Sequence, residues 1–273
     1  MILFVFEGKK REPLLFETIQ KLFFQKETDT FVCTYNSNIY SLYSKLREYD
    51  VFEGMSAAGD TVSILNEILE SKGDYTLSDI VVSDVSQIYL FFDYDFHESR
   101  LTLSENNSHI EDMLRYFSDE TENGKLYINY PMVESIRYTR ELPDINYISY
   151  TVLRDACKHF KHEVAQFSYY PSLDHLLISA NCNETEESRR ERLATACRNW
   201  MHLIYMNVGK ANNICHETPL LPERIEEIAQ MNIFYAQLTK YVNTSECRVS
   251  ILNAFPIFIY EYWGRVPEIE NIL

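Results

Sequence analysis

Short apolar runs alternate with longer amphipathic segments through the first half of the chain. Four of these runs are five or six residues long and rich in aromatic and aliphatic side chains; they cover residues 2–6, 31–35, 87–92 and 125–130. Such runs are typical of parallel strands that are buried on both faces. Between them, apolar residues recur every three or four positions, as in amphipathic helices. The alternation predicts an α/β fold, with a parallel sheet, right-handed crossovers and helices on both sides.

Capping and turn residues indicate where the helices between the strands begin. Each of five helices is opened by a residue that can cap a helix or that suits its first turn. In chain order these positions are Pro13, Asn36 or Ser37, Asp60, Asn107 or Ser108, and Pro131. The helix at residue 13 is expected to continue to residue 25, and the remainder of residues 50–85 predicts mainly loop.

The pattern changes after about residue 142. Helical periodicity covers residues 145–165, 186–208, 222–242 and 245–263, with prolines in the segments between them. We therefore predict two units: an α/β domain at residues 1–142, and an α-helical lobe at residues 143–273 that packs on the sheet.

The third predicted strand runs directly into two acids. Residues 87–92 are followed by Asp93 and Asp95, with a single residue between the two. In an extended segment alternate side chains point the same way, so these two carboxylates are spaced to share one cation. Ligands of α/β proteins bind at the carboxyl ends of the parallel strands. The sequence therefore places a candidate site at this edge of the sheet.

Two further acids are expected at the same edge. Glu7 follows the first strand, and Glu134 begins the helix after the fourth. Converging carboxylates suit Mg²⁺ or Mn²⁺, and such sites act on phosphate groups by clamping them and stabilising the charge of a displacement. The chain has no Gly-x-Ser-x-Gly motif, so the sequence does not favour a serine nucleophile.

Composition restricts the partners and the compartment. The formal net charge is −16, with 41 acids against 25 bases, so the chain repels nucleic acid at long range. Action on nucleic acid would require a local basic patch, a metal or a partner that delivers the substrate. Six scattered cysteines without a Cys-x-x-Cys pair, no secretory signal and no apolar stretch of bilayer length predict a cytoplasmic protein without a membrane span.

Three motifs at the predicted strand ends resemble a known family. They are EGKKREP at residues 7–13, DYDFH at 93–97 and YPMVE at 130–134. An apolar strand ending in Glu-Gly, followed by a strand ending in Asp-x-Asp, resembles the Toprim domain. The match is closest to Toprim proteins of the RloB and AbiL kind and to OLD-like phage-defence nucleases, including effectors of PARIS-type systems. Arg11 departs from the pattern, since the family more often has a small hydroxyl residue there.

This resemblance implies a role for each of the acids. Glu7 would be a metal ligand or the general acid/base, and Asp93 and Asp95 would hold Mg²⁺ or Mn²⁺. Glu134 would be a further ligand or an orienting acid. The implied activity is metal-dependent cleavage of phosphodiesters in DNA or RNA, including transfer RNA, by a toxic effector of an abortive-infection system.

The resemblance also implies roles for two other residues and for partners. Lys10 would contact a phosphate oxygen, and His97 would orient an aspartate or assist proton transfer. Such effectors work with an ATPase of the SMC/ABC or AAA type, and a homodimer is a further expectation. The absence of a Gly-x-x-x-x-Gly-Lys motif agrees with a separate ATPase.

Two other interpretations remain open from the sequence. The chain could be a non-catalytic Toprim-like regulatory or interaction protein, in which the acids are remnants of the fold. It could also be a phosphatase-like or receiver-like domain that uses the same acids on a small phosphate. A receiver is expected to have a lysine at a later strand end, whereas Lys125 begins its strand.

Overall fold

A mostly parallel five-stranded sheet forms the centre of the computed structural model, which describes residues 1–24, 28–52, 61–178 and 185–267. Its strand order is β2-β1-β3-β5-β4. Four parallel strands are β1 (Ile2–Phe6), β2 (Thr30–Thr34), β3 (Gln87–Asp93) and β5 (Gly124–Asn129). The predicted strands are confirmed to within one residue at either end. The sequence analysis did not predict β4 (Ser118–Asp119), a two-residue strand antiparallel to β5 at the edge.

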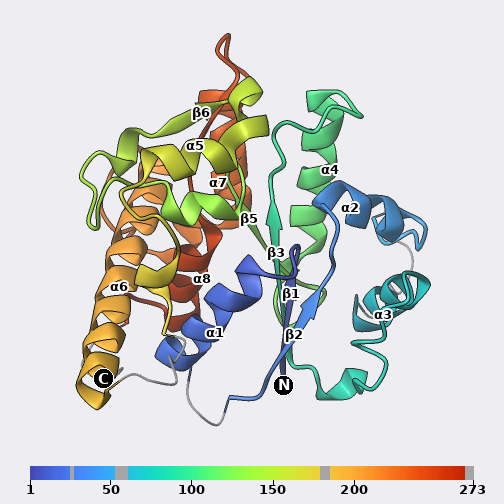
Figure 1. The fold of residues 1–273 in the computed structure, drawn as a ribbon. Coiled ribbons are helices and arrows are strands. Elements are labelled where there is room, and N and C mark those ends of the chain that lie inside the picture. Colours follow the sequence, from blue (N-terminus) through green and yellow to red (C-terminus); the bar gives the residue numbers. More distant parts are fainter. Residues whose placement is uncertain (25–27, 53–60, 179–184, 268–273) are drawn as a thin grey trace.

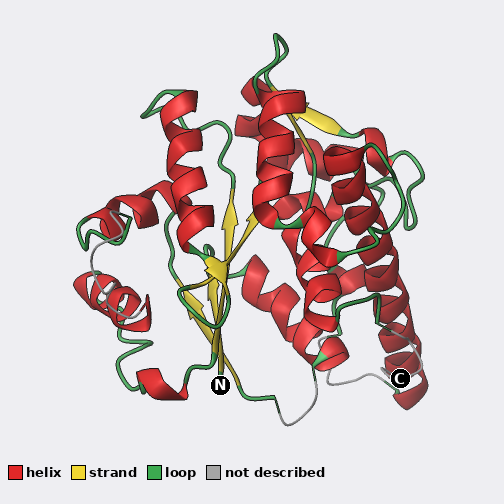
Figure 2. Ribbon diagram, turned by 180° about the vertical axis from the view of Figure 1, so that it is seen from behind, coloured by secondary structure: helices red, strands yellow, loops and turns green. Residues whose placement is uncertain are grey.

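Helices cover both faces of this sheet (Figures 1 and 2). On one side lie α2 (Ile39–Arg47), α3 (Thr61–Ser71) and α4 (Leu103–Tyr116); on the other lie α1 (Arg11–Phe23) and α8 (Ala254–Trp263). The α/β class with helices on both sides is thus confirmed. The sheet ends at β2 and β4, and all strands except β4 point the same way, so their carboxyl ends form one edge.

Several predicted helix starts differ from the observed ones. Asn38, not residue 36 or 37, caps α2, and its side chain accepts a hydrogen bond from the Ser41 N–H at 3.0 Å. Helix α4 begins four or five residues earlier than the predicted start at residue 107 or 108, because Thr102 and Glu105 form a reciprocal capping box. The segment after Pro131 is a 3-10 helix, η2 (Val133–Arg137). The predicted cap at residue 60 lies outside the described residues.

The second half contains α5 (Phe160–Phe167), α6 (Glu186–His216), α7 (Gln230–Gln237) and α8, with short turns between them. These short elements are the 3-10 helices η3 (Tyr147–Ser149), η4 (Arg154–His159), η5 (Asp174–Leu176) and η6 (Ile225–Ile228) and the π-helix η7 (Leu238–Val242). The first half contains a further 3-10 helix, η1 (Val82–Asp84). Helix α6 continues eight residues beyond its predicted end, and the predicted helix at 222–242 is divided among η6, α7 and η7.

Two of the predicted helices are interrupted by strands, so these predictions were wrong as continuous elements. Within residues 145–165 lies β6 (Thr151–Leu153), and within 245–263 lies β7 (Arg248–Ser250). The two strands pair antiparallel, with Val152 opposite Val249. Their hydrogen bonds join segments about a hundred residues apart in sequence, and such a pairing is not visible in local periodicity.

Helix α8 returns from the second half to pack on the sheet of the first. The Phe255 ring stacks on Phe91 of β3 at 4.6 Å between centroids, and Phe258 lies edge-on to Tyr89 at 4.9 Å. The buried core is continuous through both halves. The division at residue 142 remains a prediction about folding units. No helix in the described ranges combines the length and the apolarity needed to cross a bilayer.

Candidate functional site

Glu7 and Asp93 lie where the strand order of the sheet reverses. Strand β1 has β2 on one side and β3 on the other, and this point is the usual ligand crevice of an open α/β sheet. Glu7 directly follows β1, and its N–H donates to the Phe91 carbonyl oxygen at 3.0 Å. Its carboxylate accepts a hydrogen bond from the Asp93 N–H at 2.9 Å. The two acids, 86 residues apart in sequence, are therefore neighbours at the carboxyl edge.

Asp93 is the last residue of β3, and its side chain is only 8% exposed. The Asn129 side-chain amide donates to it at 3.1 Å, and the Val133 N–H donates a further hydrogen bond. Asn129 is its direct partner in the register of β3 and β5. Asp93 is thus held by the neighbouring strand and by the start of η2. Asn129 was not among the predicted site residues, although its polar side chain lies near the end of the fourth predicted strand, where site residues are expected.

Asp95 differs in backbone conformation from the prediction. The strand ends at Asp93, and Asp95 has φ of 47°, in the left-handed region, so the two acids are not two positions of one extended segment. The Asp95 side chain hydrogen-bonds Asn38, and the positive charges of His97 and Lys161 act on it. Asp93 and Asp95 are nevertheless close enough that Asp95 contributes to the raised pKa of Asp93. A turn after the strand therefore brings the two acids close together, and their sharing of one cation remains a prediction.

Glu134 lies on the same rim, in η2, and is 5% exposed. It forms ion pairs with Arg11 and, at 3.4 Å, with Lys161. Because Lys161 also acts on Asp95, it links Glu134 to the other acids. Among the described residues, Oε2 of Glu134 is buried without a hydrogen-bond partner. A buried carboxylate oxygen without a partner is costly in free energy, which indicates a place for a further ligand.

Glu12 is a fifth acid of this cluster; it lies within the motif at residues 7–13 and had no predicted role. Its side chain is 5% exposed and accepts the Gly8 N–H at 3.0 Å. A Cβ atom at Gly8 would lie 2.8 Å from one carboxylate oxygen of Glu12 and 2.9 Å from the other. Gly8 therefore leaves room for this carboxylate beside Glu7, and the charge of Glu12 acts on both Glu7 and Asp93.

Lys10 and His97 differ in their positions relative to the acids. Lys10 is exposed at the start of α1, and within the described part of the chain it has no recorded ion pair with the acids. The next residue along the chain, Arg11, does reach one of them, because it contacts Glu134. His97 is partly buried, its charge lowers the pKa of Asp95, and its Nδ1 is buried without a hydrogen-bond partner among the described residues. Its predicted roles, to orient an aspartate or to assist proton transfer, remain predictions.

The electrostatics of the cluster favour an added cation. Burial, followed by the charges of Asp93 and Asp95, raises the pKa of Glu7. Burial, followed by the charges of Glu12 and Asp95, raises the pKa of Asp93. Burial also raises the pKa of Asp95, in part offset by His97. Carboxylates that raise each other's pKa in this way can ionise together when a divalent cation lies between them.

The donor set suits Mg²⁺ or Mn²⁺, whose preferred ligands are carboxylate oxygens. Across the described residues, however, no three Asp, Glu, His or Cys side chains are arranged as a ready ligand group. The hydrogen bonds described above account for the lack of such a group. The Glu7 carboxylate is directed to the Asp93 N–H, that of Asp93 to Asn129, and that of Asp95 to Asn38. Fitting a metal requires these carboxylates to turn away from their present partners. The unpaired Oε2 of Glu134 is available without such a change.

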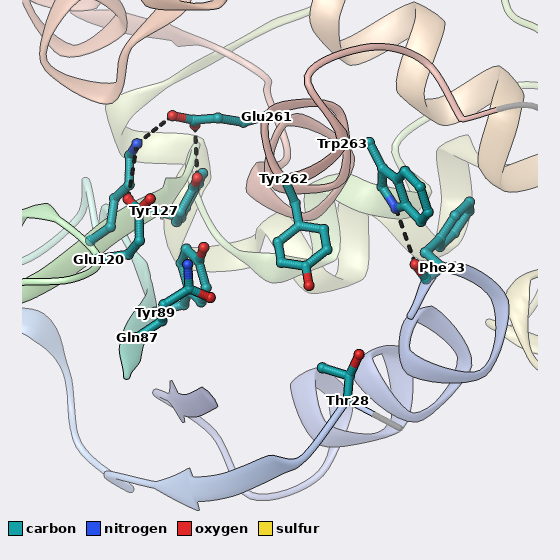
Figure 3. Close-up of a pocket in the computed structure, with 10 residues that line it drawn as sticks. Phe23, Thr28, Gln87, Tyr89, Glu120, Tyr127, Glu261, Tyr262 and Trp263 are labelled. Atoms are coloured by element: carbon teal, nitrogen blue, oxygen red, sulfur yellow. Dashed lines mark hydrogen bonds and ion pairs between the residues drawn. The ribbon is translucent and has the colours of Figure 1, made fainter. Parts of the chain in front are cut away.

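A cavity of about 470 Å³ lies at the opposite edge of the sheet (Figure 3). Gln87 and Lys125, near the amino ends of their strands, form part of its wall. Its carboxylate Glu261 already pairs with Lys125 and accepts the Tyr127 hydroxyl at 2.7 Å. Because its charged groups are paired and the acids of the rim lie at the other edge, this cavity is not part of the candidate site.

Comparisons of the chain with family models, with curated proteins and with solved structures gave no match in any of the three. The fold and the site define the class: an α/β protein with an acidic cluster at the switch point of a mostly parallel sheet.

Proposed function

We propose that this protein is a metal-dependent nuclease of the Toprim type that hydrolyses phosphodiesters of DNA or RNA. The observation that carries the proposal is the acidic cluster itself: Glu7, Asp93 and Asp95 lie at one rim and burial and mutual repulsion raise their pKa values. Repulsion of this kind lowers the stability of the fold, and carboxylates with perturbed pKa values in a crevice are typical of functional sites.

In this proposal Glu7, Asp93 and Asp95 hold Mg²⁺ or Mn²⁺. Bound there, the cation supplies Lewis-acid stabilisation of the charge on the phosphate oxygens. Asn129 and Asn38 fix the orientation of the two aspartates. Lys161 and Arg11, both paired with Glu134, lie where a phosphate oxygen can be neutralised as it approaches the rim. His97, next to Asp95, is placed to move a proton at the edge of the site.

The cellular role that we propose is that of a toxic effector in anti-phage defence, controlled by a partner ATPase of the SMC/ABC or AAA type. Two observations support a need for a partner. The net charge of −16 disfavours unaided approach to nucleic acid, and the chain has no phosphate-binding loop motif of its own. The three motifs at residues 7–13, 93–97 and 130–134 support the assignment to this type of protein.

Cleavage of labelled DNA and of total RNA in Mg²⁺ or Mn²⁺ tests the proposal. Glu7→Gln and Asp93→Asn keep the shape of each side chain and remove its charge, so we expect the cleavage rate to fall about a hundredfold or more. Glu17→Gln is the matched control, because Glu17 is exposed and pairs with Lys21 on the surface of α1. Full activity in Glu7→Gln or Asp93→Asn would show that the site is assigned wrongly.

The second candidate is a non-catalytic Toprim-like regulatory protein. One observation favours it: in the described residues the carboxylates are bound to their own hydrogen-bond donors, with no ready metal ligand group. Calorimetric titration with Mn²⁺ separates the two candidates. Millimolar or tighter binding that Asp93→Asn abolishes supports the nuclease, and no binding in either protein supports the regulatory role.

A further inference from the structure

A second cavity, of about 370 Å³, lies directly beside the acidic rim. It opens between the first turns of α1, the 3-10 helix η2 and the segment at residues 171–177. Glu134 and Arg11 belong both to this cavity and to the rim. A molecule whose reacting group is at Asp93 and Asp95 can therefore extend into the cavity.

The walls of the cavity are of two kinds. One part is aliphatic and comes from Leu14, Leu15, Val133, Ile136, Leu173 and Leu177. The other part is polar and charged: it contains the guanidinium groups of Arg11 and Arg137 together with Ser172 and the carboxylates of Glu134 and Asp174. We name this cavity the guanidinium pocket. An aliphatic surface beside two guanidinium groups suits a ligand with a flat apolar part and an anionic part.

Arg137 lacks the partner that buried or half-buried arginines usually have. Its Nη1 donates to the Pro171 carbonyl oxygen at 2.7 Å, and no carboxylate within the described ranges forms an ion pair with it. The like charge of Arg11 acts on it in addition. Because Arg11 already pairs with Glu134, Arg137 is the guanidinium group of this cavity that has no carboxylate partner among the described residues, and an anion in the cavity would supply one.

We propose that the guanidinium pocket binds one unpaired nucleotide next to the phosphodiester that is cleaved. The base lies on the aliphatic wall, and Arg137 together with Arg11 binds the phosphate that joins this nucleotide to the scissile position. A base can lie flat on the aliphatic wall only after it has left its stack, so the nucleotide enters from a single strand or after it has left the duplex. This inference rests on the proposed nuclease function and adds a preference for unpaired substrate.

Equilibrium binding tests the pocket separately from cleavage. All variants are made in the Glu7→Gln background with a chelator, and fluorescence anisotropy is measured at low salt with a labelled eight-nucleotide single strand of mixed sequence and with its duplex. We expect the single strand to bind more tightly than the duplex. Arg137→Gln is expected to weaken single-strand binding about tenfold, and Arg137→Lys, which keeps the charge but not the planar fork, to weaken it less.

A second variant reports on the aliphatic wall. Leu173→Trp fills the pocket without removing a charge, and it is expected to weaken single-strand binding about tenfold as well. Arg115→Gln is the matched control, since Arg115 is 65% exposed on α4 and pairs with Glu111. Thermal unfolding of each variant confirms that it is folded.

The outcomes separate this inference from the nuclease assignment. Unchanged single-strand binding in both Arg137→Gln and Leu173→Trp, or equal weakening of single strand and duplex, would overturn the pocket assignment. Competition by inorganic phosphate as strong as that by a nucleoside monophosphate would overturn the role of the base. If the pocket variants lose single-strand binding but the unsubstituted protein cleaves no nucleic acid, the pocket assignment stands and the nuclease assignment is rejected.

Discussion

Asn129 joins Asp93 to the C-terminal helix of the protein through one side-chain amide. Its nitrogen donates to an Asp93 carboxylate oxygen at 3.1 Å, and its oxygen accepts the Ala254 N–H at 3.0 Å. Ala254 is the first residue of α8, which packs on the sheet. The helical half therefore takes part in fixing an acid of the candidate site, although it contributes none of the predicted ligands.

Replacement of Asn129 tests this link. In Asn129→Ala both the Asp93 carboxylate and the Ala254 N–H lose a buried partner, and we expect the free energy of unfolding to fall by about 2–4 kcal/mol. In Asn129→Asp the amide donor becomes a carboxylate facing Asp93, so the loss is expected to be larger at pH 8 than at pH 5. Urea unfolding at the two pH values measures both effects.

The control for these variants is Asn146→Ala, because Asn146 is exposed in the turn before η3. Its free energy of unfolding is expected to change by less than about 0.5 kcal/mol. An equal, small loss in Asn129→Ala would contradict the proposed link.

The strands were predictable because each is a nearly unbroken apolar run. Residues 2–6 and 87–92 are buried on both faces of the sheet. A strand needs apolar side chains at consecutive positions only when both of its faces are buried. The acids could be placed at one edge for the same reason, since the carboxyl ends of parallel strands coincide. Glu7 and Asp93 thus followed from the pattern and from the topology that it predicts.

The remaining parts depend on contacts between distant segments. The pairing of β6 with β7, the packing of α8 on Phe91, and the hydrogen bond from the Ala254 N–H to Asn129 all join residues roughly a hundred or more positions apart. The left-handed backbone of Asp95 is likewise set by the turn that follows the strand, not by the alternation of an extended segment. Neither periodicity nor composition carries this information.

Gly8 and Glu12 are predicted to be energetically coupled. A methyl group at Gly8 would lie 2.8 Å from the Glu12 carboxylate, so Gly8→Ala forces this buried side chain to move and is expected to cost about 1–3 kcal/mol. In a Glu12→Ala background the same substitution has room, and its cost should nearly disappear. A double-mutant cycle measured by urea unfolding gives the coupling energy, and a value near zero would contradict the contact.

Lys210 is a buried cation in the second half, and we predict a structural role for it. Its side chain is fully buried in α6 and donates to the carbonyl oxygens of Tyr147 and Tyr150 at 2.8 and 2.7 Å. Lys210→Met removes one of the two donors of each carbonyl group, since Tyr147 still accepts the Tyr150 N–H and Tyr150 the Ile251 N–H. The loss of two charge-assisted hydrogen bonds is expected to cost about 2–4 kcal/mol in free energy of unfolding. Lys45→Met is the control, since Lys45 is exposed and pairs with Glu48. A loss as small as that of the control would show that water or another donor replaces the amine.

The raised pKa of Glu7 predicts how the metal-free protein responds to pH. Its folded-state pKa lies above the unfolded value of about 4.3, so the folded protein keeps a proton that the unfolded chain loses. The stability from this difference is complete below that value and is lost as the pH rises toward the folded-state pKa. Asp93 and Asp95 shift in the same direction and add to the loss.

Thermal unfolding in a chelator at pH 5 and pH 8.5 measures this effect. Glu7→Gln removes the charge that appears at high pH, so its midpoint at pH 8.5 is expected to exceed that of the unsubstituted protein by about 3 °C or more. At pH 5 the two proteins should differ little, and Glu17→Gln should follow the unsubstituted protein at both pH values. Millimolar Mn²⁺ is expected to raise the midpoint of the unsubstituted protein at pH 8.5 but not that of Glu7→Gln, because the cation offsets the repulsion only where the carboxylate is present. Identical midpoints for the two proteins at pH 8.5 would mean that Glu7 does not experience the repulsion on which the candidate site depends.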